Sequence, residues 1–289
     1  MDIEQQGIET ARRAGLPRLW TVFASYRVRD GLVEPASRET TRFYAPAAHS
    51  ELLNAFSRLH DGTEEDILRF VGSYGLLGFW ELTARNAQEP RRPGDPLRWI
   101  IQHAHTIRLV MDLWRLLQDG DEVELRRALA ELSRPVTTVE FAAGPLVKRQ
   151  PFLLGTVLRG PAPFALARDI VRTILNDNLA GIGPTLSERD QCLRLSFSFR
   201  ALIDILYYQL ATAVTGGRLQ RCAAQGCSGL FVQHDPRQRF CPPWFDQKGE
   251  SLCSLRERQR TWRVRKSQQL THTKKPRQPR RMTKKGARA

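Results

Sequence analysis

Apolar residues recur every three or four positions through most of residues 1–217, which is the spacing of helices that bury one face. The clearest run follows Asp95-Pro96, which we expect to begin a long helix with the proline at its first position and Gly120 as its stop. Its apolar stripe comprises Trp99, Ile100, His103, Ile107, Val110, Trp114 and Leu117. The same spacing predicts further helices over residues 50–59, 63–75, 121–132, 163–180 and 201–214.

Two stretches alternate between apolar and polar residues, which is typical of strands. We expect a hairpin that turns at Asp30-Gly31, with one strand over Trp20–Arg29 and a return strand within Leu32–Tyr44. A further strand is expected over Gln191–Phe199. Residues 1–217 are therefore predicted to form a mainly α domain with minor β-structure, suited to sensing a ligand or binding a partner.

Four of the five cysteines lie close together near the C-terminus, with the spacing C-x4-C-x13-C-x11-C. Two pairs of thiolates that converge on one point satisfy a tetrahedral Zn²⁺ ion. We expect Cys222, Cys227, Cys241 and Cys253 to bind structural zinc. His234 is an alternative ligand, and the separate Cys192 is expected to be a structural free thiol.

A pair of disulfides is the alternative use of these cysteines, and it belongs to secreted proteins. The N-terminus shows no apolar signal segment, and no apolar run approaches the length of a membrane span. We therefore expect a cytoplasmic protein, in a reducing compartment where cysteines of this spacing bind metal.

The residues between the cysteines predict a small metal-nucleated module over residues 218–266. We expect Phe231-Val232 and Arg239–Cys241 to pair as a hairpin, with Cys253 at the start of a helix, which is a treble-clef-like order. A core of Phe231, Phe240 and Trp244 is too small to fold unaided, so zinc would supply the missing free energy.

The charge of the chain is concentrated behind this module. Residues 218–289 contain 19 Lys and Arg against 4 Asp and Glu, whereas residues 1–217 contain 26 of each. The predicted helix Ser254–Lys266 carries a single acid, Glu257, and a set of cations expected to contact nucleic acid. These are Arg256, Arg258, Arg260, Arg263, Arg265 and Lys266. Such a cationic end is typical of a protein that binds a polyanion.

Two further expectations concern this C-terminal part. Leu255 and Trp262 lie seven residues apart, so both should dock on the hairpin, which makes Trp262 a core residue rather than a platform for stacking bases. Residues 267–289 are basic, lack apolar periodicity and are expected to be a disordered tail.

The C-terminal module resembles the bacterial CGNR-type zinc fingers, in which a C-x4-C pair, an aromatic residue and a third cysteine precede C-G-N-R and a basic helix. Here the fourth cysteine opens Cys253-Ser254-Leu255-Arg256, so the motif arginine is matched while the glycine and asparagine are replaced. The segment PPWFDQKGESL lengthens the gap before it. The resemblance implies a stress-induced bacterial transcription regulator with a helical N-terminal domain.

The combined interpretation is a DNA-binding transcription regulator, with DNA preferred over RNA as its partner and no membrane association. We expect no enzyme, because phosphate-binding, metalloprotease and nucleophile-elbow motifs are absent from the sequence. His103 is expected to be a hydrogen-bonded core histidine. Two alternatives use the same residues: an RNA-binding protein, and a protein-interaction adaptor in which zinc is a purely structural clip.

Overall fold

The computed structural model describes residues 19–37, 39–49, 51–83, 94–132, 162–189, 192–227, 229–243 and 249–273. In this part the chain is mainly α with minor β-structure, as the periodicity predicts. Trp244 and residues 274–289 lie outside the described residues, together with the expectations that concern them.

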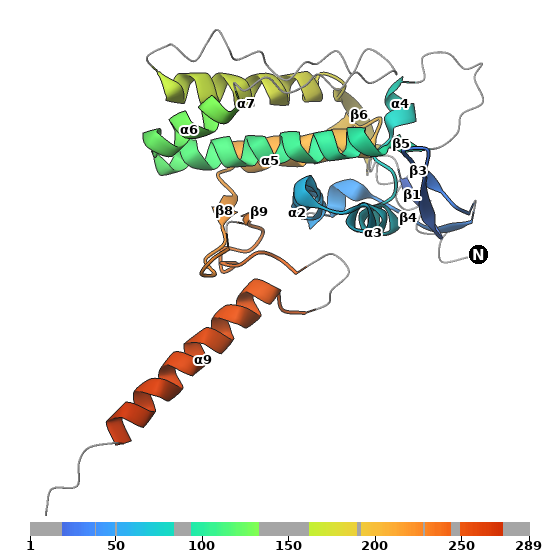
Figure 1. Ribbon diagram of the computed structural model, residues 1–289. Helices are drawn as coiled ribbons and strands as arrows, with labels where there is room; N and C mark the ends of the chain where they lie inside the picture. The colour runs from blue at the N-terminus through green and yellow to red at the C-terminus, as the bar shows by residue number, and fades with distance from the viewer. Residues whose placement is uncertain are drawn as a thin grey trace, which may run out of the picture.

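Helices account for most of the described chain. Their bounds are η1 (Pro46–Ala48), α2 (Glu51–Phe56), η2 (Ser57–Asp61), α3 (Glu64–Tyr74), α4 (Phe79–Thr83), α5 (Leu97–Asp119), α6 (Glu122–Leu132), α7 (Pro163–Leu179), α8 (Leu202–Thr215) and α9 (Leu252–Thr273). The long α5 runs through the middle of the body and contacts α6, α7, α8 and η2 (Figure 1). The helix α9 projects from the body at the end of the module that follows α8 (Figure 1).

The strands form four small antiparallel sheets within the described residues. Their bounds are β1 (Trp20–Phe23), β2 (Tyr26–Arg29), β3 (Leu32–Pro35), β4 (Thr40–Tyr44), β5 (Asp95–Pro96), β6 (Gly183–Arg189), β7 (Cys192–Ser198), β8 (Leu219–Arg221) and β9 (Leu230–Val232). The turn at Asp30-Gly31 is confirmed, because both residues adopt positive φ and β2 pairs with β3. The prediction of one continuous strand over Trp20–Arg29 is wrong. The strand is interrupted before Tyr26, and its first part, β1, pairs with β4.

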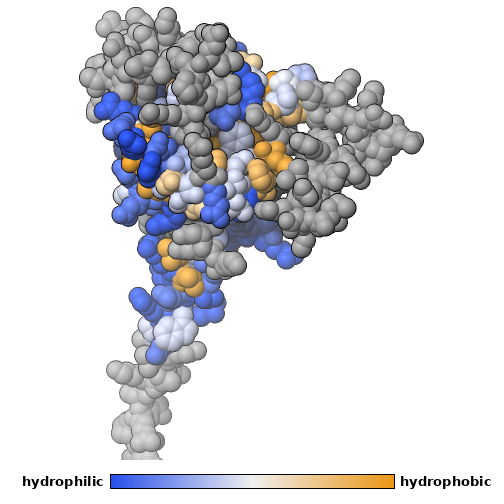
Figure 2. All heavy atoms as spheres, turned by 90° about the vertical axis from the view of Figure 1, so that its right-hand side faces the viewer, coloured by the Kyte–Doolittle hydropathy of each residue, from blue (hydrophilic) through white to orange (hydrophobic). Residues whose placement is uncertain are grey.

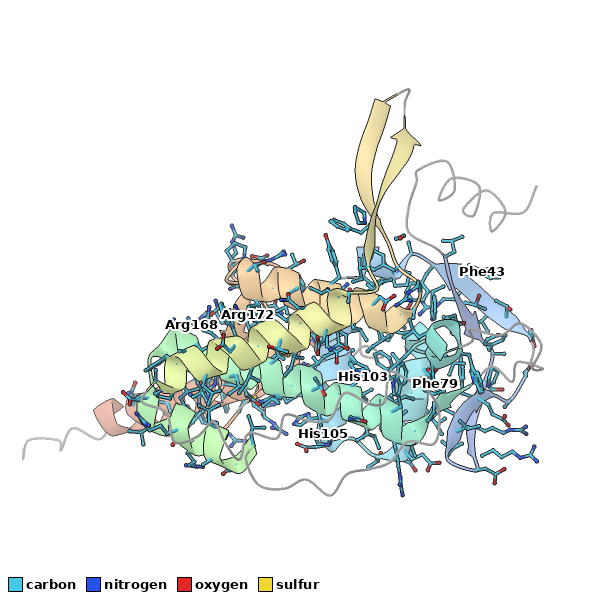
Figure 3. The ribbon with its side chains drawn as sticks, turned by 90° about the horizontal axis from the view of Figure 1, so that it is seen from above. Phe43, Phe79, His103, His105, Arg168 and Arg172 are labelled. Atoms are coloured by element: carbon cyan, nitrogen blue, oxygen red, sulfur yellow. The ribbon has the colours of Figure 1, made fainter. Side chains whose placement is uncertain are left out.

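The core of the body forms around α5, and the predicted apolar stripe includes four of the eight buried residues of this helix. Trp99, Ile100, Ile107 and Val110 are buried as predicted. The buried face also includes Ala104, Met111, Leu113 and Leu116, because helices pack on two sides of α5 and widen the stripe. His103 is half-buried on α5 and its Nδ1 lies 2.8 Å from the Tyr207 hydroxyl, which confirms a hydrogen-bonded histidine (Figure 3).

Helix ends follow local capping rules at two of the predicted places. Thr63 caps α3, where its side chain accepts a hydrogen bond from the Asp66 N–H and the Asp66 carboxylate accepts one in return. Gly120 ends α5 in the left-handed conformation. The expected start of α5 at Asp95-Pro96 is wrong, because these two residues form β5 and the helix begins at Leu97.

Asp95 instead connects two segments of the body. Its side chain is fully buried, and its carboxylate accepts hydrogen bonds from the backbone N–H groups of Leu77 and Phe79, the second at 2.8 Å. Burial raises the pKa of Asp95 from 3.8 to about 7, although these N–H donors act in the opposite direction. A titrating carboxyl therefore lies at the junction of β5 with the segment that precedes α4.

We expect Asp95 to make the stability of the body depend on pH. Between about pH 4 and pH 7 the folded chain retains a proton at Asp95 that the unfolded chain releases, so the free energy of unfolding should fall as the pH rises through this window. Urea unfolding at pH 5 and pH 7.5 measures this effect, and the Asp95→Asn variant is the control that lacks the titration. Parallel pH dependence in both proteins would contradict the assignment.

Candidate metal centre

The two strands of the C-terminal module are joined by the loop that carries the first two cysteines. β8 pairs with β9, with Leu219 opposite Val232 and Arg221 opposite Leu230. The predicted pairing of Phe231-Val232 with Arg239–Cys241 is therefore wrong. The segment before Cys241 instead lies against the first cysteine loop, where the Ala223 N–H donates to the Arg239 carbonyl at 2.8 Å. The partner of β9 is β8, which precedes the first cysteine loop. The turn residues that follow β9 in the sequence carry no information about this pairing.

All four predicted cysteines meet at one point. The Sγ atoms of Cys222, Cys227, Cys241 and Cys253 lie within 4.8 Å of one another, and all four thiols are free. The Cys227 Sγ lies 3.8 Å from that of Cys241 and 3.6 Å from that of Cys253. Four sulfur ligands about 2.3 Å from a tetrahedral ion are about 3.8 Å apart. The cluster therefore has the size that a thiolate-bound metal ion requires.

Electrostatics within this cluster favour a bound cation. Burial raises the pKa of Cys253 to about 12, and it also raises the pKa of Cys241, with the neighbouring thiols adding to both effects. At Cys227 burial is outweighed by the Gly229 N–H and the Cys253 thiol, which lower the pKa. Four ionised sulfurs this close repel one another, and a metal cation at their centre removes the repulsion.

Backbone N–H groups support the sulfur atoms. The Gly229 N–H donates to the Cys227 Sγ at 3.3 Å, and the Cys241 N–H donates to the Cys222 Sγ at 3.4 Å. Gly229 also gives the sulfurs room, because a Cβ at this position would lie 2.6 Å from the Cys241 Sγ. Sequence reasoning missed this residue, whose only signal is a glycine two positions after the second cysteine.

The module has a small apolar core of its own. Cys222, Ala224 and Phe231 are buried there, with Phe240 and the other three cysteines packed against them. The roles expected for Phe231 and Phe240 are confirmed. A core of this size supplies too little free energy to hold the loops, so the metal would contribute a large part of the stability of the module.

The module also contacts the helical body directly. The Asn54 side chain on α2 is buried, and its amide pairs with both backbone groups of Val232: it accepts from the N–H at 2.7 Å and donates to the carbonyl at 3.2 Å. Arg58 donates to the Pro242 carbonyl at 2.7 Å. Leu219, Leu230 and Val232 pack in the core of the body. Sequence reasoning missed Asn54, a polar residue within the apolar run LLNAF.

The helix α9 begins at the four-cysteine cluster. Ser251 is buried and its hydroxyl accepts a hydrogen bond from the Ser254 N–H, so the helix starts at Leu252 rather than at Ser254. Cys253 is thus its second residue. The helix continues to Thr273, which contradicts the expectation that a disordered tail begins at residue 267. Uncharged residues carry the helix past Lys266 although they show no apolar period.

The six predicted cations all lie on α9 and all are exposed. Figure 2 shows mainly hydrophilic side chains along the projecting helix. Arg258 pairs with Glu250 at 2.8 Å, and Arg260 pairs with Glu257 at 3.4 Å. For Arg256, Arg263 and Arg265 the described residues provide no acidic partner within ion-pair distance. α9 therefore presents net positive charge to solvent.

The expected core position of Trp262 is wrong. Its side chain is 60% exposed and the Lys266 ammonium lies 4.8 Å from the centre of its ring, whereas Leu255 is half-buried. The contacts between α9 and the rest of the module that the structure shows end at Glu257, whose carboxylate accepts from the Gln225 N–H at 3.4 Å, and at Arg258, which pairs with Glu250. The seven-residue spacing places Leu255 and Trp262 on one face of the helix. It does not show that the surface packed against Leu255 ends before Trp262.

The remaining candidate residues take no part in the cluster. His234 is exposed and is not among the residues that surround the sulfur atoms, so the alternative ligand is not supported. The side chain of Cys192 lies outside the described residues. Within the described ranges, no helix combines the length and apolar character needed to cross a membrane.

Comparison with protein-family models, with curated proteins and with solved structures found no match to this chain. The resemblance to CGNR-type zinc fingers therefore rests on the motif residues alone. What the structure adds independently is the convergence of four cysteines at the base of a cationic helix.

We expect Gly229→Ala to weaken the metal centre, because its Cβ would displace the Cys241 sulfur. Metal affinity, measured by competition with a chromogenic chelator, should fall by about 10- to 100-fold. The control is Gly72→Ala in α3, where a Cβ meets no atom within 4 Å. That variant should bind metal normally and gain up to about 1 kcal/mol in unfolding free energy. Equal metal affinity in both variants would refute this role for Gly229.

Proposed function

We propose that this protein binds nucleic acid through α9, with double-stranded DNA preferred over RNA, and that it acts as a transcription regulator. Zn²⁺ held by Cys222, Cys227, Cys241 and Cys253 fixes the base of the helix. The helical body serves to sense a ligand or a partner. The observation that carries this proposal is that the second residue of an exposed, cationic helix belongs to the four-cysteine cluster.

The distribution of charge supports a polyanionic partner. The whole net charge of +15 is accounted for by residues 218–289, because residues 1–217 contain equal numbers of cations and anions. A helix with exposed arginines can neutralise phosphates and release their counterions, so binding would weaken as salt increases. A surface that served only for solubility would need no metal centre at its base.

The donor set supports zinc. Four thiolates in tetrahedral contact select soft or borderline metals over magnesium or calcium, and zinc is the metal that most structural sites of this kind contain. With all four positions filled by sulfur, no coordination site remains for a substrate water, which fits a structural role.

We expect Arg263→Glu to lower the affinity for random-sequence duplex DNA by roughly tenfold or more at physiological salt, because it removes a phosphate contact and adds repulsion. Fluorescence anisotropy across a salt series measures this effect. The control is Arg168→Glu on α7 (Figure 3), an exposed residue that changes the net charge by the same amount. An equal loss of affinity in both variants would mean that only the net charge of the protein matters. Unchanged affinity in Arg263→Glu would favour the alternative of a protein-interaction adaptor.

We further expect Cys253→Ser to lose both metal and DNA affinity while the body stays folded. Elemental analysis should give one zinc per chain for the wild type and less than about a tenth of that at matched chelator concentration for the variant. Competition with RNA of the same length then separates DNA from RNA as the partner. A variant that retains zinc at full affinity would remove Cys253 from the site.

A further inference from the structure

The arginines of α9 form two rows on opposite sides of the helix. Arg256, Arg260 and Arg263 recur at intervals of four and three residues and so share one face. Arg258 and Arg265 are seven residues apart and share another face. At about 100° per residue, this second face lies roughly 180° from the first. The cations are therefore divided between two sides instead of forming one basic stripe.

An uncharged strip runs between the two rows. Thr261, Val264 and Gln268 follow at intervals of three and four residues, and all three are exposed. Their positions on the helical wheel lie midway between the rows. Trp262 and Lys266 occupy the opposite side, where the ammonium of Lys266 covers the indole ring. Glu257, one turn before Thr261, begins the same strip, so this face is neutral from Thr261 onward, where arginines flank it on both sides.

Enough of the helix is free of the module to use this face. The side chains from Arg258 to Gln268 are all exposed, and α9 extends away from the body (Figure 1). Residues 258–273 form a rod about 24 Å long at 1.5 Å per residue. A polyanion can therefore reach both rows at once.

Cations on two opposite sides suit a groove rather than a flat surface. A helix that lies along the outside of a nucleic acid brings only one face to the phosphates. In the major groove of B-form DNA, which is about 12 Å wide, phosphates line both walls and base edges form the floor. The major groove of A-form RNA is too deep and narrow for a helix to enter.

Resting on the proposed function, we infer that α9 enters the major groove of B-form duplex DNA. The two arginine rows bind phosphates of opposite strands. Thr261, Val264 and Gln268 face the base edges, where methyl groups contact thymine and a glutamine amide pairs with adenine. Trp262 faces away from the DNA.

The matched variants Arg263→Gln and Arg265→Gln test this geometry. Both substitutions remove one positive charge, and the two residues are two positions apart in different rows. Neither arginine has an acidic partner among the described residues. With zinc-loaded full-length protein and a random-sequence duplex, each variant should lose roughly fivefold in affinity at physiological salt and about one unit of salt slope. Trp262→Ala should change affinity less than twofold.

Chemical protection gives a second measurement on the same complexes. Dimethyl sulfate methylates guanine N7 in the major groove and adenine N3 in the minor groove. At saturating wild-type protein, we expect protection of guanine N7 without protection of adenine N3.

The outcomes separate this inference from the proposed function. If only one of the two arginine variants binds more weakly, or guanine N7 stays reactive, α9 lies outside the groove and the inference falls while DNA binding stands. A loss in Trp262→Ala equal to that of the arginine variants, or tighter binding of duplex RNA, also overturns it. If the double variant Arg263→Gln/Arg265→Gln binds as the wild type does, the proposed function fails as well. Equal metal content and helicity in every variant establish that folding is unchanged.

Discussion

The convergence of four cysteine thiols is the interaction on which the C-terminal part of the chain depends. Helix α9 has no continuous apolar face, and its contact with the module ends within about two turns. Hydrophobic packing therefore cannot fix its direction. The place of Cys253 in the sulfur cluster, the cap from Ser251 and the contact at Glu257 are what orient it. Without a cation among the sulfurs, these few bonds would have to hold a long charged helix against its own repulsion.

Strand β9 links the cysteine cluster to the helical body because its side chains alternate between two faces. Successive side chains point to opposite faces, so Leu230 and Val232 pack in the core of the body while Phe231 packs beside the cysteines. The Asn54 amide pairs with the backbone of Val232 and replaces the neighbour that this edge would otherwise lack. Asn54 therefore holds β9, which lies between Cys227 and Cys241 in the chain, against α2.

The errors made from sequence concern which surfaces meet in space. β1 pairs with β4 and β9 pairs with β8, because a strand of three or four residues is stabilised by whichever edge tertiary packing brings to it. Asp95 was expected to begin the long helix, but it is buried and accepts hydrogen bonds from the N–H groups of Leu77 and Phe79. Trp262 obeyed helical spacing and still remained exposed, since the surface opposite it ended earlier.

By itself the sequence determined most of the longer helices, the ends at Thr63 and Gly120, the four cysteines that cluster and the location of the excess charge. These follow from local periodicity, from the spacing of cysteines and from composition, which need no knowledge of distant contacts. Only the tertiary structure decided the strand pairing, the roles of Asn54 and Gly229, and the length of α9 that stays free of the body. Those features depend on which surfaces meet in space, and a linear pattern specifies the face of an element but not the neighbour that covers it.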